Sequence, residues 1–271
     1  MTEEQKKTEE QKKTNGAVTT KAASNVLSPE TLQHLENLGG AGLETITTDD
    51  MATPRIKILA SNSPELDSLE GAKPGMIINS VPPHQMWKGN EGFEVIVCGY
   101  DKVWLEWEDR GIGSSAPVNI FSAQNKPTDA VRGDDGKFRL PSGNYLEESA
   151  NFYVLILDKD GLPKPAIISM KSTQLKVARA WAYGLKNEFI QNPTSKKMFL
   201  APSWYRIYHL TTTKQTNSKG SWFGWVLDKK EFITDDNTFE MASDFNESIR
   251  KGLIKPKYDE ESDQMSGDIP F

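Results

Sequence analysis

Residues 164–228 read KPAIISMKSTQLKVARAWAYGLKNEFIQNPTSKKMFLAPSWYRIYHLTTTKQTNSKGSWFGWVLD. The opening run KPAIISM is apolar and β-branched, which is typical of a buried strand. Residues 174–189 carry Leu, Ala and Phe at helical spacing, so they predict a helix. The runs 203–213 and 221–228 predict two strands, and the segment NSKG at 217–220 predicts a hairpin turn between them. A strand, a helix and a hairpin therefore follow one another in this part of the chain.

Strand-like runs also dominate the chain between residue 54 and this segment. They read PRIKILAS, GMIINSV, GFEVIVCGY, KVWLEWED and NFYVLILD. A Gly- and charge-rich stretch at 109–149 predicts an elaborated loop region among them. Three strands, a helix and two strands are the order of an OB-fold, a five-stranded Greek-key barrel. We therefore predict a mainly β protein with few helices, built on an OB-fold-like five-stranded barrel with elaborations. A mixed α+β sandwich gives the same order of elements and stays open.

The charges of the chain are strongly segregated. The net charge is −6, yet residues 161–227 hold ten bases and a single acid, Glu188. Residues 259–271 hold five acids and no base. An acidic protein thus contains a strongly basic segment, which is the usual electrostatic footprint of a polyanion partner. The alternative is a solvated face whose bases pair with acids elsewhere in the chain.

The basic segment is also rich in aromatic side chains. Ten of the twenty-five aromatic residues of the chain lie in 161–227. Proteins that bind single-stranded nucleic acid combine a positive groove for the phosphates with rings on which bases stack, at ~1–3 kcal/mol per base. Cations and rings interleaved in one segment predict such a surface. Packing in the core remains the alternative for any single ring.

The strand predicted at 203–213 carries the most detailed prediction. Because side chains alternate across a strand, we expect Trp204, Arg206 and Tyr208 to share one face. We assign that face to the outside, because an Arg between two rings is poor core material, and we assign Tyr205 and Ile207 to the inside. The predicted DNA-binding residues are Trp104, Lys171, Lys176, Arg179, Trp204, Arg206, Tyr208, Lys214, Lys219 and Trp222.

The sequence offers little support for an enzyme. The three His residues are far apart in the sequence and lack the spacing of metal ligands. No phosphate-binding loop of the Walker type occurs, and a single cysteine, Cys98, excludes an intramolecular disulfide framework and a Cys-based zinc site. We therefore predict no catalytic residue, no metal site and no cofactor. Acids at 106–109 and 134–135 leave a Mg²⁺-dependent nuclease open as a weaker alternative.

The last residues of the chain are a separate signal. The tail YDEESDQMSGDIPF is acidic and ends in a short apolar hook. A basic pocket with an apolar floor on another protein could hold the terminal ring and carboxylate together. The predicted partner-binding residues are Asp268, Ile269, Pro270 and Phe271.

This tip resembles the C-termini of bacterial and phage single-stranded DNA-binding proteins, in which acidic residues precede Ile-Pro-Phe. The segments PRIKILASNSPEL and GMIINSV are similar to those of phage-encoded proteins of this class. The chain departs from the family at 265–267, MSG, where further Asp is common. The departure puts the strength of partner binding in doubt.

The resemblance implies a protein that coats single-stranded DNA during phage DNA replication, recombination or repair. The tip would recruit replication and recombination partners, such as a polymerase, helicase, nuclease or RNA polymerase. A homo-oligomer stays open. The alternative is a protein–protein interaction module that contacts RNA polymerase or a virion component without binding DNA.

These observations also divide the chain into segments. We expect a disordered N-terminal segment at 1–27, a short helix and linker at 28–53, and the DNA-binding domain at 54–235. A C-terminal helix at 236–255 and an acidic disordered tail at 256–271 follow. No run of eighteen apolar residues occurs, and the first residues lack the apolar stretch of a secretory signal. We expect a cytoplasmic protein without a membrane partner.

Overall fold

A computed structural model of the chain describes residues 27–46, 54–109, 116–158, 162–218, 220–256 and 258. The chain forms two compact units, Met1–Ile46 and Thr47–Phe271. The described part of the first unit contains helix α1 (Pro29–Asn37), which the sequence predicts. Ser28 caps this helix, because its hydroxyl accepts a hydrogen bond from the Thr31 N–H at 3.3 Å. None of the residues of α1 is buried.

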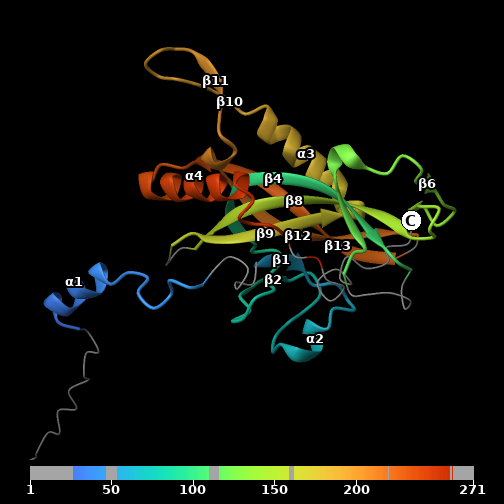
Figure 1. Ribbon diagram of the computed structural model, residues 1–271, viewed down its shortest axis with the longest axis horizontal. Helices are drawn as coiled ribbons and strands as arrows, with labels where there is room; N and C mark the ends of the chain where they lie inside the picture. The colour runs from blue at the N-terminus through green and yellow to red at the C-terminus, as the bar shows by residue number, and fades with distance from the viewer. Residues whose placement is uncertain are drawn as a thin grey trace, which may run out of the picture. The chain divides into compact units, whose positions relative to one another are not determined.

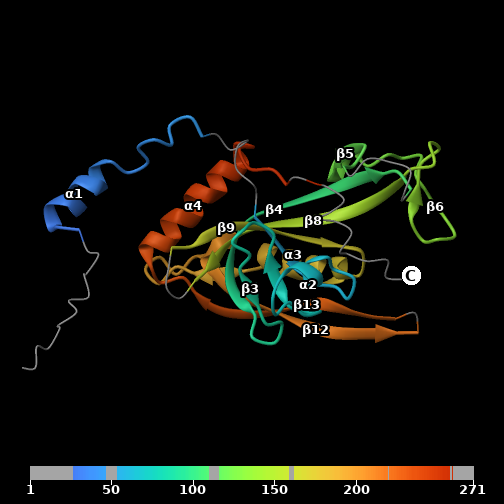
Figure 2. The same cartoon turned by 90° about the horizontal axis from the view of Figure 1, so that it is seen from below.

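The second unit is a mixed α/β, strand-rich structure built on one curled sheet that resembles half of a barrel (Figure 1, Figure 2). Among the described residues, eight strands follow one another across the sheet in the order β13-β12-β4-β8-β9-β1-β2-β3. Their bounds are β1 (Arg55–Ile58), β2 (Ile77–Asn79), β3 (Met86–Trp87), β4 (Phe93–Trp107), β8 (Tyr145–Leu157), β9 (Lys164–Lys171), β12 (Arg206–Asn217) and β13 (Gly220–Phe232).

Five of these strands follow the predicted order. The strands β4, β8 and β9 come first, helix α3 (Leu175–Lys186) follows, and β12 and β13 complete the set. Every pairing between neighbours in the series β13-β12-β4-β8-β9 is antiparallel. The runs GFEVIVCGY and KVWLEWED form one continuous strand, β4, rather than two. A register shift between Val97 and Gly99 lets this strand bend while it stays paired with β8.

The sheet is larger than the predicted five-stranded barrel. The run PRIKILAS supplies β1, which pairs in parallel with β9, with Ile56 opposite Ile168. The run GMIINSV supplies β2, which pairs antiparallel with β1 and continues to β3. The edge of β9 that lies away from β8 is therefore occupied by an N-terminal strand.

Short elements fill much of the predicted loop region at 109–149. They are β5 (Asn119–Ser122), the 3₁₀ turn η2 (Ala123–Asn125), β6 (Val131–Arg132) and β7 (Phe138–Arg139). Strand β5 pairs with β4, and β7 pairs with β8. The remaining short elements of the second unit are α2 (Glu65–Ser68), η3 (Ser172–Gln174), β10 (Phe189–Gln191), β11 (Met198–Leu200) and η4 (Ser203–Tyr205).

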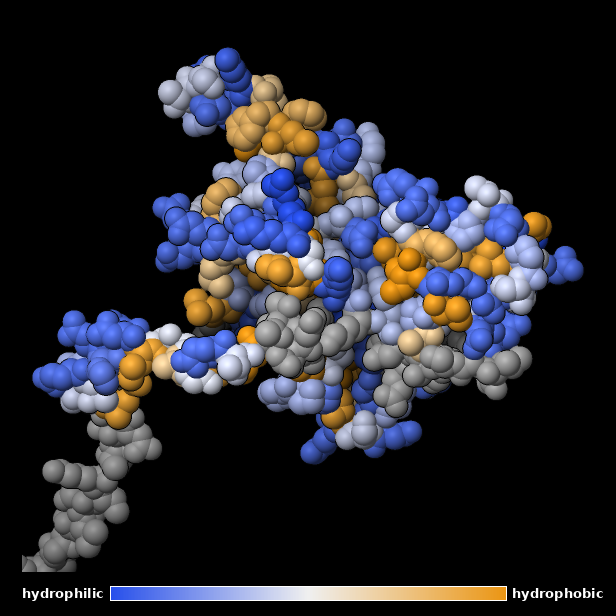
Figure 3. Space-filling model, in the orientation of Figure 1, coloured by the Kyte–Doolittle hydropathy of each residue, from blue (hydrophilic) through white to orange (hydrophobic). Residues whose placement is uncertain are grey.

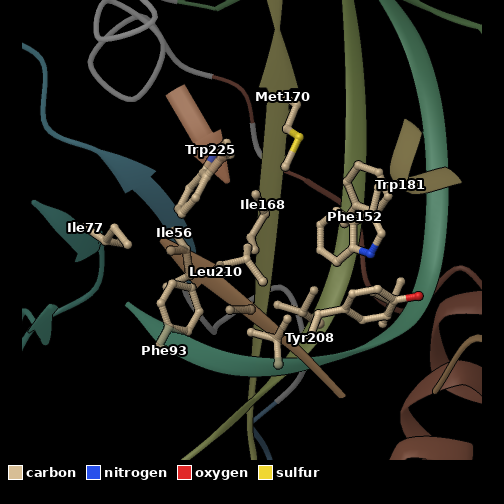
Figure 4. Close-up of a cluster of buried hydrophobic side chains, with 14 of the residues drawn as sticks. Ile56, Ile77, Phe93, Phe152, Ile168, Met170, Trp181, Tyr208, Leu210 and Trp225 are labelled. Carbon is tan, nitrogen blue, oxygen red and sulfur yellow. The ribbon is translucent and has the colours of Figure 1, made fainter. Parts of the chain in front are cut away.

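Helices cover both faces of the central strands. Helix α3 packs on one face through Trp181, whose ring stacks 4.2 Å from Phe152 and meets Tyr208 edge-on at 5.4 Å (Figure 4). Helix α4 (Asp236–Arg250) packs on the opposite face through Ala242 and Phe245. The central strands therefore have a buried core on each side.

The segment after α4 returns to the sheet. Tyr258, which lies within the predicted acidic tail, is 8% exposed and packs against Val103, Leu105 and Trp107 of β4. The side-chain N–H of Asn151 donates to the Tyr258 hydroxyl at 2.7 Å. In the described residues, no helix is long and apolar enough to cross a membrane.

Candidate nucleic-acid interface

The predicted outward face of the strand at 203–213 is not exposed. Tyr208 is 2% exposed and packs between α3 and the sheet, so its assignment to the outside is wrong. Ile207 packs on the opposite face, against the cluster under α4. The reason is that helices cover both faces of β12 at this point, so neither face is left for solvent.

Trp204 and Arg206 also differ from the prediction. Trp204 lies in η4, ahead of the strand, and its ring is 6.4 Å from that of Phe239 on α4. Arg206 is turned into an internal network, where it binds Glu188 and lies 3.7 Å above the Phe232 ring. The three predicted neighbours therefore do not form a common outer surface.

Two further predicted residues lie inside the protein. The side chain of Lys171 is 3% exposed and forms an ion pair with Glu147 at 3.0 Å. Trp104 is 8% exposed and packs edge-on against Phe138. The accessibility that the prediction requires of Lys171 and Trp104 is therefore wrong, because β8 and β9 bury the first and Phe138 of β7 packs on the second.

The predicted ribbon of β12 and β13 keeps two accessible residues. Lys214 is exposed near the end of β12, and Trp222 is partly exposed on β13. The indole N–H of Trp222 donates to the Gln215 side chain at 2.9 Å, which holds the ring across the ribbon. Lys219 lies outside the described residues, as do the tip residues 268–271.

The exposed cations gather instead along the outer side of α3. Lys176, Arg179, Tyr183 and Lys186 are spaced at i, i+3, i+7 and i+10, so they form one stripe on the helix. All four are exposed, and Tyr183 is 73% exposed. Lys176 and Arg179 are among the residues that the sequence predicts as DNA contacts, whereas Tyr183 and Lys186 are not singled out as site residues.

The stripe continues onto β4. Arg179 and Lys102 both bind the Glu148 carboxylate, at 3.1 and 3.4 Å. Tyr100 lies next to them and is 44% exposed. Burial and the Glu148 carboxylate raise the pKa of the Tyr100 hydroxyl, while the Arg179 cation acts to lower it. We call this set the α3 surface; it consists of Tyr100, Lys102, Lys176, Arg179, Tyr183 and Lys186. It joins four cations with two accessible rings, and the Glu148 carboxylate lies between Lys102 and Arg179.

A two-stranded hairpin, β10–β11, projects beyond the C-terminal end of α3 (Figure 1). Its apolar side chains are accessible, and Figure 3 shows them gathered on the projection. The exposed members are Phe189, Met198, Phe199 and Leu200, between 42% and 61% exposed. The sequence carried a signal for it, because the apolar runs FIQ and MFL flank the turn-rich NPTSKK.

Glu188 anchors the base of this hairpin. Its carboxylate accepts hydrogen bonds from Arg206 on β12 and from Lys229 on β13, the latter at 2.5 Å. Burial alone would raise the pKa of Glu188, but these two cations lower it overall. The single acid of the basic segment is therefore neutralised within the fold and does not offset the charge of the α3 surface.

Three of the acids that left a nuclease open, Glu106, Asp109 and Asp135, have structural partners. The Glu106 carboxylate accepts from the amides of Asn119 and Asn144, both at 2.7 Å. Asp109 and Asp135 both pair with Arg139. Among the residues that the structure describes, no group of three or more His, Cys, Asp or Glu side chains could hold a metal ion.

Comparison with known proteins gives a family for this chain. No curated protein and no solved structure matches it. Residues 19–255 match the family model described as Pam3 phage gp34-like protein. The matched range includes the whole sheet, the α3 surface and the β10–β11 hairpin, and it ends before the tip at 268–271. The chain therefore belongs to the Pam3 phage gp34-like protein family, a bacteriophage protein family.

Proposed function

We propose that this chain binds single-stranded DNA through the α3 surface. The observation that carries the proposal is the stripe of Lys176, Arg179 and Lys186 around the exposed ring of Tyr183. Phosphates need cations along their path, and unstacked bases need accessible aromatic faces. Helix α3 alone supplies both, and the phage family of the chain is consistent with a role in phage DNA replication, recombination or repair.

The arrangement of strands supports an OB-fold-like core. In an OB-fold the first strand pairs with the second and the fourth, and a helix separates the third from the fourth. Strand β4 pairs with β8 and β12 in the same way, and α3 separates β9 from β12. On this reading the β12–β13 ribbon corresponds to the loop that grips nucleic acid in OB-folds, so Lys214 and Trp222 form a second contact.

The C-terminal tip supplies the recruiting function in this proposal. Its residues 268–271 resemble the partner-binding tips of single-stranded DNA-binding proteins, and the five acids of 259–271 favour a basic partner surface. Tyr258 fixes the start of the tail to the sheet. The segment that carries the tip would therefore leave the domain next to β4.

The direct test is binding of a fluorescein-labelled oligo-dT, followed by anisotropy. Most tryptophans of the chain are buried, so the label on the DNA reports binding better than the protein does. Tyr183→Ala is expected to weaken binding by about 5- to 150-fold, the equivalent of ~1–3 kcal/mol for one lost stack. The matched control is Tyr183→Phe, which keeps the ring and should keep the affinity of the wild type.

A protein–protein module without DNA binding is the second candidate. The exposed apolar hairpin favours it, because patches of this kind mark contact surfaces between proteins. Wild-type protein that leaves the anisotropy of oligo-dT unchanged at low salt would refute the DNA proposal and favour this candidate.

A further inference from the structure

The β10–β11 hairpin has apolar side chains on both faces. In its register Phe189 lies opposite Leu200 on one face, and Ile190 lies opposite Phe199 on the other. Each strand of the hairpin is three residues long, and each pairs with the other in a sheet of its own. An isolated two-stranded hairpin is marginal in water, and accessible apolar surface of this kind marks an interaction site.

The charge around the hairpin restricts what can cover it. Lys196 and Lys197 are exposed at its turn. At its base, Arg206 and Lys229 surround the single carboxylate of Glu188. Two hairpins packed against each other would bring these cations together, and like charges across an interface are costly. The complementary surface must therefore be acidic and partly apolar.

Helix α4 of the same chain offers such a surface. Asp236, Glu240, Asp244 and Glu247 are spaced at i, i+4, i+8 and i+11, so they form one stripe, and all four are exposed. Phe239 lies beside this stripe and is 36% exposed. Cations follow at the C-terminal end of α4, where Arg250 and Lys251 lie and where Lys251 pairs with Glu247 at 2.9 Å. The first two turns of α4 thus present acids and a ring to solvent.

We propose that the β10–β11 hairpin of one copy docks on the acidic stripe of α4 of a second copy. Lys196 and Lys197 face Asp236 and Glu240, and the apolar hairpin side chains cover Phe239. Two copies joined by this contact keep one free hairpin and one free α4 between them, so the contact is heterologous and repeats from copy to copy. Copies joined in an open row could bind side by side along one strand of DNA. This last consequence rests on the proposed DNA binding, whereas the contact itself does not.

The test uses the full chain without DNA. Sedimentation velocity at low salt is expected to give a weight-average mass that rises with protein concentration, and high salt should abolish the rise. Lys196→Glu/Lys197→Glu and Asp236→Lys/Glu240→Lys are each expected to weaken self-association by about tenfold or more. An equimolar mixture of the two variants restores complementary charge at every contact, so it should recover association.

Controls separate the contact from general charge effects and from misfolding. Lys73→Glu/Lys88→Glu reverses two exposed lysines near β2 and β3, outside the proposed contact, and should leave association unchanged. Phe199→Ser should weaken association without any change of charge. Thermal unfolding followed by circular dichroism checks that each variant is folded.

Three results would overturn the proposal: a wild-type chain that stays monomeric at low salt, reversals that leave association unchanged, or a mixture that fails to recover it. Failure of the DNA proposal would give a different result. The wild-type chain would not bind an oligo-dT too short to hold two copies, while the self-association of the wild type and of the charge-reversal variants would stay as expected.

Discussion

The α3 surface predicts how strongly salt controls DNA binding. Each phosphate that a protein cation neutralises on single-stranded DNA adds about −0.7 to the slope of log Kobs against log salt. The surface has four cations, but Lys102 and Arg179 share the Glu148 carboxylate, which reduces their effect. Within the described part of the chain, Lys176 and Lys186 form no ion pair. Replacing both by Ala should therefore make the slope less steep by about 1.4.

The assay is the affinity for labelled oligo-dT measured across a series of salt concentrations, with wild type and Lys176→Ala/Lys186→Ala compared on one plot. The two lines should converge as salt rises, because the lost interactions are those that release counterions. Lys255→Ala removes an exposed lysine just beyond α4, on the opposite face of the sheet from α3, and should keep the wild-type slope. A variant whose line runs parallel to that of wild type would refute the assignment of DNA phosphates to α3, even if its affinity fell.

Three further predictions follow from the core, the hairpin base and the tail. Trp181→Ala should lower the free energy of unfolding by ~3–5 kcal/mol in urea titrations, because it removes the buried ring between Phe152 and Tyr208; a cost below ~1 kcal/mol would mean that α3 is not packed as described. Because the pKa of Glu188 is lowered in the folded state, its carboxylate stabilises the fold fully above the unfolded pKa of about 4.3. This stabilisation is lost as the pH falls through the pKa of the folded state. Glu188→Gln should therefore be less stable than wild type at pH 7, and the gap should narrow below about pH 4; a gap that does not depend on pH would contradict the charge assignment. Deleting residues 259–271 removes five acids and should tighten oligo-dT binding at low salt; unchanged or weaker binding would argue against competition between tail and DNA.

The succession of elements could be read from the sequence because its signals are local. Helical periodicity at 174–189 predicts α3 (Leu175–Lys186), and the turn chemistry at 217–220 predicts the β12–β13 hairpin. The short helix expected within 28–53 is α1, which Ser28 caps. Neighbouring side chains and backbone groups decide such features within a few residues, so they survive without knowledge of the rest of the fold.

The residues that the sequence wrongly assigned to the surface have a common cause for the error. Alternation along a strand tells which side chains share a face, but it does not tell what covers that face. Tyr208 is buried because α3 packs over it, and Ile207 is partly buried because α4 packs on the other side. The covering residues belong to α3 and α4, so the pattern within 203–213 alone cannot predict them.

The sequence by itself determined the segregation of charge, the order of three strands, a helix and two strands, and the absence of an evident catalytic motif. Only the tertiary structure decided which cations and rings reach solvent. It buried Lys171 beside Glu147 and left Tyr183 exposed between Lys176 and Lys186. The physical reason is that composition and periodicity depend on neighbours along the chain, whereas exposure depends on whichever distant element packs over a residue.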